Sequence, residues 1–255
     1  MIFTGLLTAQ ETAVQRLNES PRHHEWVEVT YNNRTVQAFL VFPQVSEKVP
    51  AVLLIHENRG LSDWVRGMAD QVAEAGYIAI APDLLSGMGP DGGKTSDFPD
   101  LNSARDAIYQ LSQDQVTSDL DAVADYIKNH SACSGELEVA GFCWGGSQTF
   151  RFATHRPDLS AAYVFYGTAP ENMEALQNIP CPVYGFYGGN DARVTSTIDA
   201  TKERMNRAGK TYEPVVYEGA GHGFMRSGET ASPDDPNRKA RDAAWNRWRH
   251  LLKNR

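Results

Sequence analysis

The stretch Glu138–Phe150, EVAGFCWGGSQTF, decides the fold class of this chain. An apolar strand ends at Cys143, and a helix that opens on two glycines follows it. Gly141 and Gly145 lie two residues on either side of the cysteine, where side chains would crowd a sharp strand-to-helix turn. Such a turn exposes its central side chain beyond the end of a sheet.

Cys143 therefore has the surroundings of a nucleophile. The first turn of the helix supplies unpaired N–H groups and positive potential, and both stabilise a thiolate or a nearby oxyanion. The alternative is a small core cysteine, because free cysteines are often buried. Cys133 and Cys181 do not end a strand ahead of a helix, and we expect them to be structural.

Outside this stretch, apolar strands alternate with amphipathic helices. Two strands, expected to be antiparallel, surround the turn Asn32-Asn33, and further strands are predicted at 49–57, 77–84, 136–143, 161–167, 181–188 and 213–219. Helices are predicted at 61–76, 116–130, 145–155, 195–209 and 237–253. The later strands are nearly continuous runs of Val, Ile, Ala and Tyr. The pattern indicates an α/β fold with a mostly parallel central sheet of about eight strands and helices on both faces.

The domain organisation is expected to be simple. Residues 1–23 form an N-terminal extension with an amphipathic helix at 8–17, and residues 24–255 form a single α/β domain. The polar insertion 86–99 contains four glycines and two prolines and follows the strand at 77–84. We predict that this insertion is mobile and lies near the site, because few apolar side chains hold it down.

Composition excludes several classes of protein. The 255 residues are 41% hydrophobic with a net charge of −8, and no Lys/Arg cluster suggests nucleic acid as a partner. No apolar run is long enough to cross a membrane, and the first fifteen residues lack the basic start of a signal peptide. We expect a cytoplasmic monomer or small homo-oligomer, or a periplasmic or secreted protein if a leader was removed.

Two further strand ends carry residues that complement Cys143. Asp191 follows the strand at 181–188 behind two glycines, and His222 follows the last strand among further glycines. The chain order is therefore nucleophile, acid and histidine, which is one of the known orders of a catalytic triad. The three residues all come at the carboxyl ends of predicted strands, where open parallel sheets bind their ligands.

The chain resembles the dienelactone hydrolase family (carboxymethylenebutenolidases) of the α/β-hydrolase fold. The similar stretches are IHENRG, APDLLS, GFCWGG, GGNDARV and GAGHGFMR, between residues 55 and 226. The resemblance implies Cys143 as nucleophile, His222 as base and Asp191 as the acid that orients it. It also implies that Glu57 bonds to the thiol and controls when a thiolate forms. The expected oxyanion hole consists of the backbone N–H groups of Trp144 and Asn58.

The family holds a substrate carboxylate with two arginines, and this chain matches one of them. Arg226 corresponds to the first, whereas Gly87 stands near the place of the second. Arg59, Arg105 or Lys94 could substitute, and the alternative to a dienelactone hydrolase is a paralogue that acts on other esters. Further candidates for substrate contacts are Tyr166 and Phe224, which with Trp144 would form an apolar wall. The structural alternatives are that Glu57 pairs with Arg59, and Arg226 with Glu229 or Asp234.

The predicted function is hydrolysis of an ester or lactone by way of an acyl-thioenzyme, without a metal or cofactor. The stretch MGPDGGKTSD lacks the first glycine of a phosphate loop, and HENRG lacks the second histidine of a zinc motif. The partner is expected to be a small-molecule ester or lactone. The alternatives are a hydrolase or transferase for another electrophile such as a phosphoester, and a non-catalytic binding protein that retains the fold.

Overall fold

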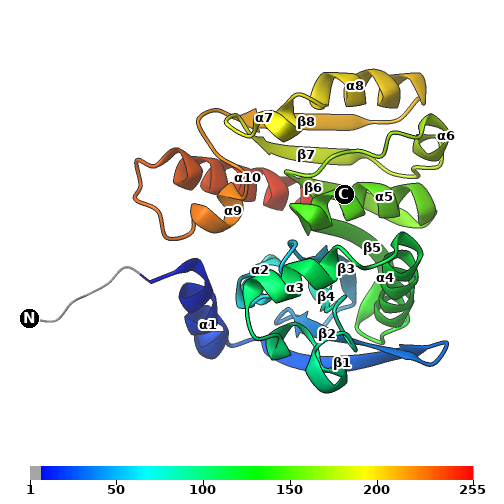
Figure 1. Ribbon diagram of the computed structural model, residues 1–255, viewed down its shortest axis with the longest axis vertical. Coiled ribbons are helices and arrows are strands. Elements are labelled where there is room, and N and C mark those ends of the chain that lie inside the picture. Colours follow the sequence, from blue (N-terminus) through cyan, green and yellow to red (C-terminus); the bar gives the residue numbers. More distant parts are fainter. Residues whose placement is uncertain (1–6, 255) are drawn as a thin grey trace, which may run out of the picture.

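The computed structural model describes residues 7–254. An eight-stranded sheet in the order β1-β2-β4-β3-β5-β6-β7-β8 forms its centre (Figure 1). The strands are β1 His23–Tyr31, β2 Arg34–Phe42, β3 Val49–Ile55, β4 Ile78–Pro82, β5 Cys133–Phe142, β6 Leu159–Phe165, β7 Val183–Gly188 and β8 Tyr212–Tyr217. Strand β2 runs antiparallel to β1 and β4, and every other pair is parallel. The predicted mostly parallel sheet is confirmed.

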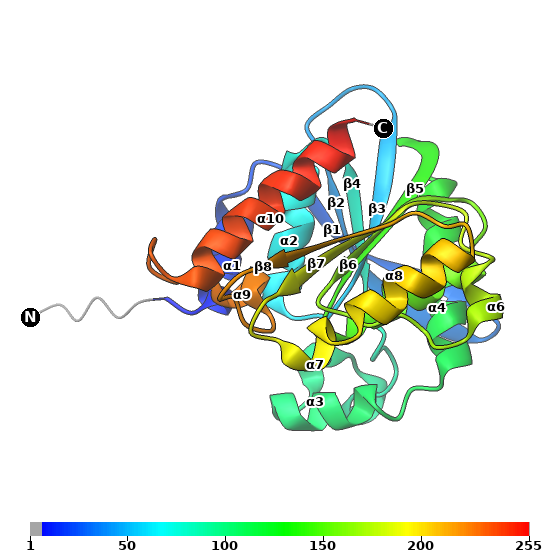
Figure 2. The ribbon, with the colours of Figure 1, turned by 90° about the horizontal axis from the view of Figure 1, so that it is seen from above.

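Helices cover both faces of this sheet (Figure 2). The longer ones are α1 Ala9–Glu19, α2 Asp63–Glu74, α3 Leu101–Ile108, α4 Gln113–Lys128, α5 Trp144–His155, α8 Ile198–Arg207 and α10 Pro236–Lys253. Short helices are α6 Met173–Leu176, α7 Ala192–Thr195 and α9 Phe224–Ser227, with single 3₁₀ turns at Pro90–Gly92 and Thr95–Asp97. In the described part of the chain, no helix is long and apolar enough to cross a membrane.

The two faces of β3 show why its sequence is apolar throughout. Leu53 and Ile55 pack into the cluster covered by α4, α5 and α8, whereas Val52 and Leu54 pack into the cluster covered by α2 and α10. All four side chains are fully buried. Side chains alternate between the faces of a strand, so a strand covered on both sides needs apolar residues at every position.

The insertion at 86–99 does not line the pocket described below, although its Thr95 hydroxyl accepts a hydrogen bond from the Leu61 amide at 3.1 Å, in the loop that contains Glu57. Its Thr95 is held by Asp83, which accepts from the Thr95 amide at 3.0 Å and from its hydroxyl at 2.6 Å. The pocket is reached instead by Tyr109, directly after α3. Helix α3 was not predicted, because it is short and starts inside the polar run at its N-cap, Asp100. The mobility of the insertion stays a prediction.

The N-terminal segment is attached to the sheet layer through α2. Ala13 of α1 is buried, and a Cβ atom at Gly67 of α2 would lie 2.9 Å from the Ala13 Cβ. The two helices therefore approach closely at this point. Residues 1–6 of the predicted extension lie outside the described residues, and the division at residue 23 stays a prediction.

Candidate active site

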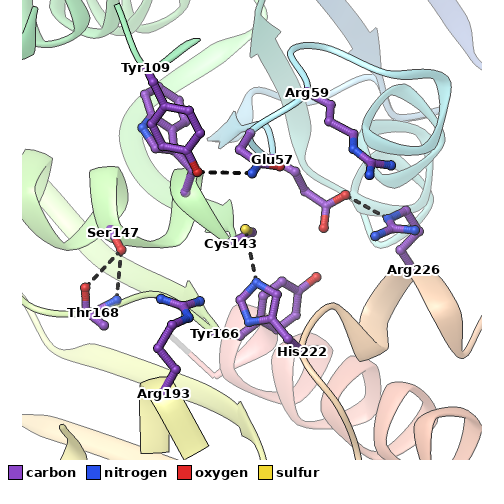
Figure 3. A pocket seen from close by; sticks show the side chains of 12 residues that line it. Glu57, Arg59, Tyr109, Cys143, Ser147, Tyr166, Thr168, Arg193, His222 and Arg226 are labelled. Atoms are coloured by element: carbon purple, nitrogen blue, oxygen red, sulfur yellow. Dashed lines mark hydrogen bonds and ion pairs between the residues drawn. The ribbon is translucent and has the colours of Figure 1, made fainter. Parts of the chain in front are cut away.

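The loops after β3, β5, β6, β7 and β8 surround a pocket of about 630 Å³ at the carboxyl edge of the sheet (Figure 3). The lining residues are Glu57, Asn58, Arg59, Tyr109, Cys143, Trp144, Ser147, Tyr166, Thr168, Arg193, His222 and Arg226. Parallel sheets place ligands at this edge because several strand ends deliver side chains to one place. Every predicted site residue except Asp191 and Phe224 lines this pocket.

Cys143 lies at the turn between β5 and α5 with φ 57° and ψ −116°, an unusual conformation for a residue with a side chain. Glycines make this turn possible. A Cβ atom at Gly141 would lie 2.2 Å from the Gly145 carbonyl oxygen, and one at Gly145 would lie 2.3 Å from the His56 carbonyl oxygen. The start of α5 therefore lies directly against the end of β3, and the Cys143 side chain is left in the pocket.

The structure brings the three residues of the predicted triad together. His222 Nε2 lies 3.1 Å from Cys143 Sγ, and His222 Nδ1 lies 2.5 Å from Asp191 Oδ2. Asp191 is buried behind the imidazole, while Cys143 is partly exposed to the pocket. The sulfur can therefore pass its proton to an imidazole whose other nitrogen is held by a carboxylate.

The contacts of His222 with Cys143 and Asp191 raise its pKa. Its hydrogen bond to Cys143 and then that to Asp191 outweigh partial burial, and they raise the pKa of His222 from 6.5 to about 8. The folded-state pKa is the higher one, so protonated His222 stabilises the fold fully below pH 6.5. That stabilisation is lost as the pH rises through about 8.

The effect predicts a pH-dependent difference between the protein and its His222→Gln variant. We expect the protein to exceed the variant in melting temperature by more at about pH 6 than at about pH 9, since only protonated His222 gains from its partners. Thermal unfolding of both proteins across this range measures the difference. A difference that does not change with pH would show that His222 titrates alike in the folded and unfolded states.

Glu57 and Arg226 form an ion pair across the pocket, with Arg226 Nε 2.8 Å from Glu57 Oε2. Neither structural alternative from the sequence holds, because Glu57 does not pair with Arg59 and Arg226 pairs with neither Glu229 nor Asp234. Partial burial opposes the charged guanidinium, but the Glu57 carboxylate outweighs it and raises the pKa of Arg226. The predicted bond from Glu57 to the thiol is absent among the contacts of residues 7–254, since its carboxylate is turned to Arg226.

The predicted apolar wall is only partly present. Tyr166 lines the pocket, and its buried hydroxyl has no hydrogen-bond partner among the described residues. Burial and then the charges of Glu57 and Cys143 raise the pKa of Tyr166 well above 10.0. Phe224 does not line the pocket, which corrects its assignment as a substrate contact. It is fully buried, with its ring centroid 5.4 Å from that of Tyr166, and so supports the tyrosine from below the surface.

The two residues predicted to supply the oxyanion donors both line the pocket. Trp144 is the first residue of α5, so its amide has no acceptor within the helix. Its ring stacks on His56 with centroids 5.6 Å apart. Asn58 follows Glu57 beyond β3, and its side chain donates to the Tyr109 hydroxyl at 3.2 Å. These contacts hold both residues at the rim of the pocket.

Gly87, which stands near the place of the second family arginine in the sequence, does not line the pocket. Gly87 lies in a separate hollow beside Arg34, away from Cys143. Lys94 lies over the Trp26 ring at 3.7 Å, and Arg105 stacks on Tyr109 at 5.7 Å; neither lines the pocket. Of the three proposed substitutes, only Arg59 lines it.

Four lining residues were missed in the sequence: Tyr109, Ser147, Thr168 and Arg193. Arg193 had a usable signal, because it lies two residues after Asp191 at the end of β7. Thr168 likewise follows the end of β6. Within residues 7–254 there is no group of three or more His, Cys, Asp or Glu side chains that could hold a metal ion.

We compared the sequence of this chain with those of known protein families. Residues 36–255 match the sequence profile of the dienelactone hydrolase family. A protein of Methylorubrum extorquens assigned as a carboxymethylenebutenolidase is 31% identical over 209 residues, which cover 78% of this chain and 71% of that protein.

Solved structures agree in fold. A protein of Klebsiella pneumoniae assigned as a dienelactone hydrolase superposes with a TM-score of 0.79 at 24% identity, covering 92% of this chain and 99% of that one. A dienelactone hydrolase-like promiscuous phosphotriesterase from metagenomic libraries gives a TM-score of 0.75 at 20% identity, covering 91% and 98%. The family profile spans most of the chain and the structures share its sheet, and from these two findings together we conclude that the chain belongs to the dienelactone hydrolase family of the α/β-hydrolase fold.

Proposed function

We propose that this hydrolase cleaves a carboxylic ester or lactone through a covalent acyl-thioenzyme on Cys143. The observation that carries the proposal is the chain of contacts from Cys143 Sγ to His222 at 3.1 Å and from His222 to Asp191 at 2.5 Å. A buried acid, a histidine and a partly exposed sulfur in one pocket form the arrangement that nucleophilic catalysis needs. A non-catalytic binding protein would have no use for this alignment.

The chemistry follows from the positions of these groups. Unprotonated His222 takes the thiol proton, and the sulfur attacks the carbonyl carbon to form a tetrahedral oxyanion. The amides of Trp144 and Asn58 stabilise that oxyanion, which for one donor is typically worth about 2.7–4 kcal/mol. The C–O bond to the leaving group then breaks, and His222 returns the proton to the departing oxygen. Water, deprotonated by His222, attacks the thioester, and the released sulfur takes back the proton.

The same scheme favours oxygen esters and lactones over amides. In the tetrahedral intermediate formed from an amide, the amine can leave only after His222 has protonated it, and until then the sulfur is the better leaving group. An ester or lactone oxygen competes far better with sulfur as the leaving group. We therefore place oxygen esters and lactones, rather than peptides, as the substrate class.

Arg226 is the proposed binding group for a substrate carboxylate. It is held by Glu57 in the structure, so an incoming carboxylate has to compete with Glu57 for the guanidinium. The carboxylate of Glu57 would then be released beside the Cys143 thiol, in agreement with the role that the family resemblance implies for this glutamate. Substrate binding and activation of the nucleophile would be coupled in this way.

Loss of Arg226 should change the preference for anionic substrates. We expect Arg226→Ala to lower the ratio of kcat/KM for phenyl hemisuccinate to that for phenyl acetate by roughly tenfold or more, the worth of one bond to a charged group. Steady-state kinetics with both esters measure the ratio. A structural role for Arg226 would instead lower both values alike, together with the melting temperature.

A phosphoester is the second candidate substrate. The reason to test it is that a promiscuous phosphotriesterase shares this fold at 20% identity. Turnover of diethyl 4-nitrophenyl phosphate, compared with 4-nitrophenyl acetate, separates the two classes.

The experiment that tests the main proposal is covalent trapping. The protein is mixed with a neutral aryl ester, quenched in acid and analysed by mass spectrometry. We expect an acyl group on the peptide that contains Cys143, and no adduct after prior alkylation with iodoacetamide. Turnover that continues unchanged after alkylation of Cys143 would exclude the acyl-thioenzyme.

A further inference from the structure

The pocket contains more arginine side chains than are needed to bind a single substrate carboxylate. Three arginines line it, namely Arg59, Arg193 and Arg226, whereas its carboxylate Glu57 is already paired with Arg226. Arg59 and Arg193 have no ion-pair or hydrogen-bond partner for their side chains within residues 7–254. The whole chain has a net charge of −8, so a local group of unpaired arginines in one pocket indicates a ligand with negative charge.

The arginines lie on two sides of the nucleophile. Arg59 and Arg226 lie together on one side of Cys143, and Arg193 lies on the other, beside Ser147 and Thr168 (Figure 3). Their origins explain the separation. Arg226 belongs to α9 after β8 and Arg59 follows β3, whereas Arg193 belongs to α7 after β7.

Ser147 and Thr168 add hydrogen-bond donors beside Arg193. The Thr168 amide donates to Ser147 Oγ at 2.9 Å, and the two hydroxyl oxygens lie 3.3 Å apart. Only one hydroxyl can donate to the other, so one hydroxyl hydrogen is left for a ligand. Together with the planar guanidinium of Arg193, it suits a carboxylate, which accepts several hydrogen bonds in one plane.

We propose that Arg193, Ser147 and Thr168 form a second carboxylate site, so that the preferred substrate carries an acidic group on each side of the scissile carbonyl. The inference rests on the proposed ester or lactone hydrolysis and narrows its substrate class. One carboxylate is bound by Arg226 and Arg59, the other by Arg193, and the carbonyl between them lies over Cys143. If Arg193 bound no carboxylate, substrates with one and with two acidic groups would be turned over equally well.

The test uses four aryl esters that differ only in charge. They are phenyl acetate, phenyl hemisuccinate, 4-carboxyphenyl acetate and 4-carboxyphenyl hemisuccinate, with no carboxylate, one on the acyl side, one on the leaving group, and both. We expect the unaltered protein to have its highest kcat/KM for the last. Arg193→Ala should lower the ratio of kcat/KM for the doubly charged ester to that for phenyl acetate by about tenfold, the effect of one charged hydrogen bond. Arg193→Lys should retain part of this preference.

Arg207→Ala is the matched control. Arg207 ends α8 on the exterior, and its loss changes the net charge equally without touching the pocket. We expect all four kcat/KM values of this variant to match those of the unaltered protein. An equal loss on all four esters in Arg193→Ala, or no loss on any, would overturn the second site. If Arg193→Ala lowered kcat/KM for only one of the two singly charged esters, and the unaltered protein did not prefer the doubly charged ester, the inference that the substrate carries two acidic groups would be overturned.

A second measurement separates this inference from the proposed chemistry. Alkylation of Cys143 by iodoacetamide should be slowed more by glutarate than by butyrate, and Arg193→Ala should remove the difference. This protection needs no turnover. Equal protection by the two acids in the unaltered protein would overturn the second site, even where Cys143-dependent hydrolysis of phenyl acetate is intact. Protection that follows the prediction without any ester hydrolysis would instead contradict the proposed function.

Discussion

The Cys143→Ala variant should lose hydrolysis of phenyl acetate by a factor on the order of 10⁴ or more, while it stays folded. Removal of the nucleophile of a triad leaves only binding and oxyanion stabilisation, and losses of this size are typical. Alanine also retains a Cβ atom at φ 57°, so the turn between β5 and α5 keeps its conformation. Steady-state kinetics and a melting curve on the same preparation measure both properties.

The other two cysteines provide the controls for this result. Cys133 and Cys181 are buried, 4% and 7% exposed, and Cys133 begins β5 while Cys181 precedes β7, so that both lie at the edge of the sheet opposite the pocket. We expect Cys133→Ala and Cys181→Ala to keep most of their activity per folded molecule. Cys143→Ser should retain a little, because serine needs a stronger base than a thiol does. Activity of Cys143→Ala close to that of the unaltered protein would end the proposed mechanism.

The Gly145→Ala variant should be destabilised by about 3 kcal/mol and should lose activity at least about a hundredfold. A Cβ atom there would lie 2.3 Å from the carbonyl oxygens of both Ile55 and His56. Both contacts are with backbone, so the start of α5 has to move away from the end of β3. Cys143 moves with it, and its 3.1 Å contact with His222 is lost. Chemical denaturation and kcat/KM for phenyl acetate measure the two effects.

A second glycine shows whether the effect is specific. Gly221 also lies in a loop at the pocket edge of the sheet, but a Cβ atom there meets only the Asn237 side-chain oxygen, at 3.8 Å. We expect Gly221→Ala to change the free energy of unfolding much less than Gly145→Ala. Similar stabilities for Gly145→Ala and the unaltered protein would mean that α5 is not held tightly against β3.

Much of the architecture could be predicted, because its signals are local. Two strands around a turn, followed by six apolar runs with helical patterns between most of them, predict a mostly parallel sheet, and the structure confirms it. The positions of Cys143, Asp191 and His222 after strand ends also follow from the sequence. Parallel strands bring their carboxyl ends to one edge, so residues far apart in the chain meet there. Their catalytic roles stay predictions that the variants above test.

Helix α3 and the orientation of the insertion at 86–99 could not be predicted from the local sequence pattern. Helix α3 has eight residues, and only Ala104, Ala107 and Ile108 of them are buried. A pattern this short, inside a polar run, does not distinguish a helix from a loop. The packing of α3 beside the sheet edge is what places Tyr109, rather than residues 86–99, at the pocket.

The sequence by itself determined the sheet and the strand ends at which reactive side chains appear. The tertiary structure alone decided which side chains pair and which face the ligand. Glu57 selects Arg226, 169 residues away, because the ends of β3 and β8 converge on one pocket. Phe224 is turned into the core under Tyr166, while Arg193 is turned into the pocket near Ser147 and Thr168. The reason is that a side chain after a strand end takes its direction from the loop backbone and from the neighbours it meets, and both depend on segments distant in the chain.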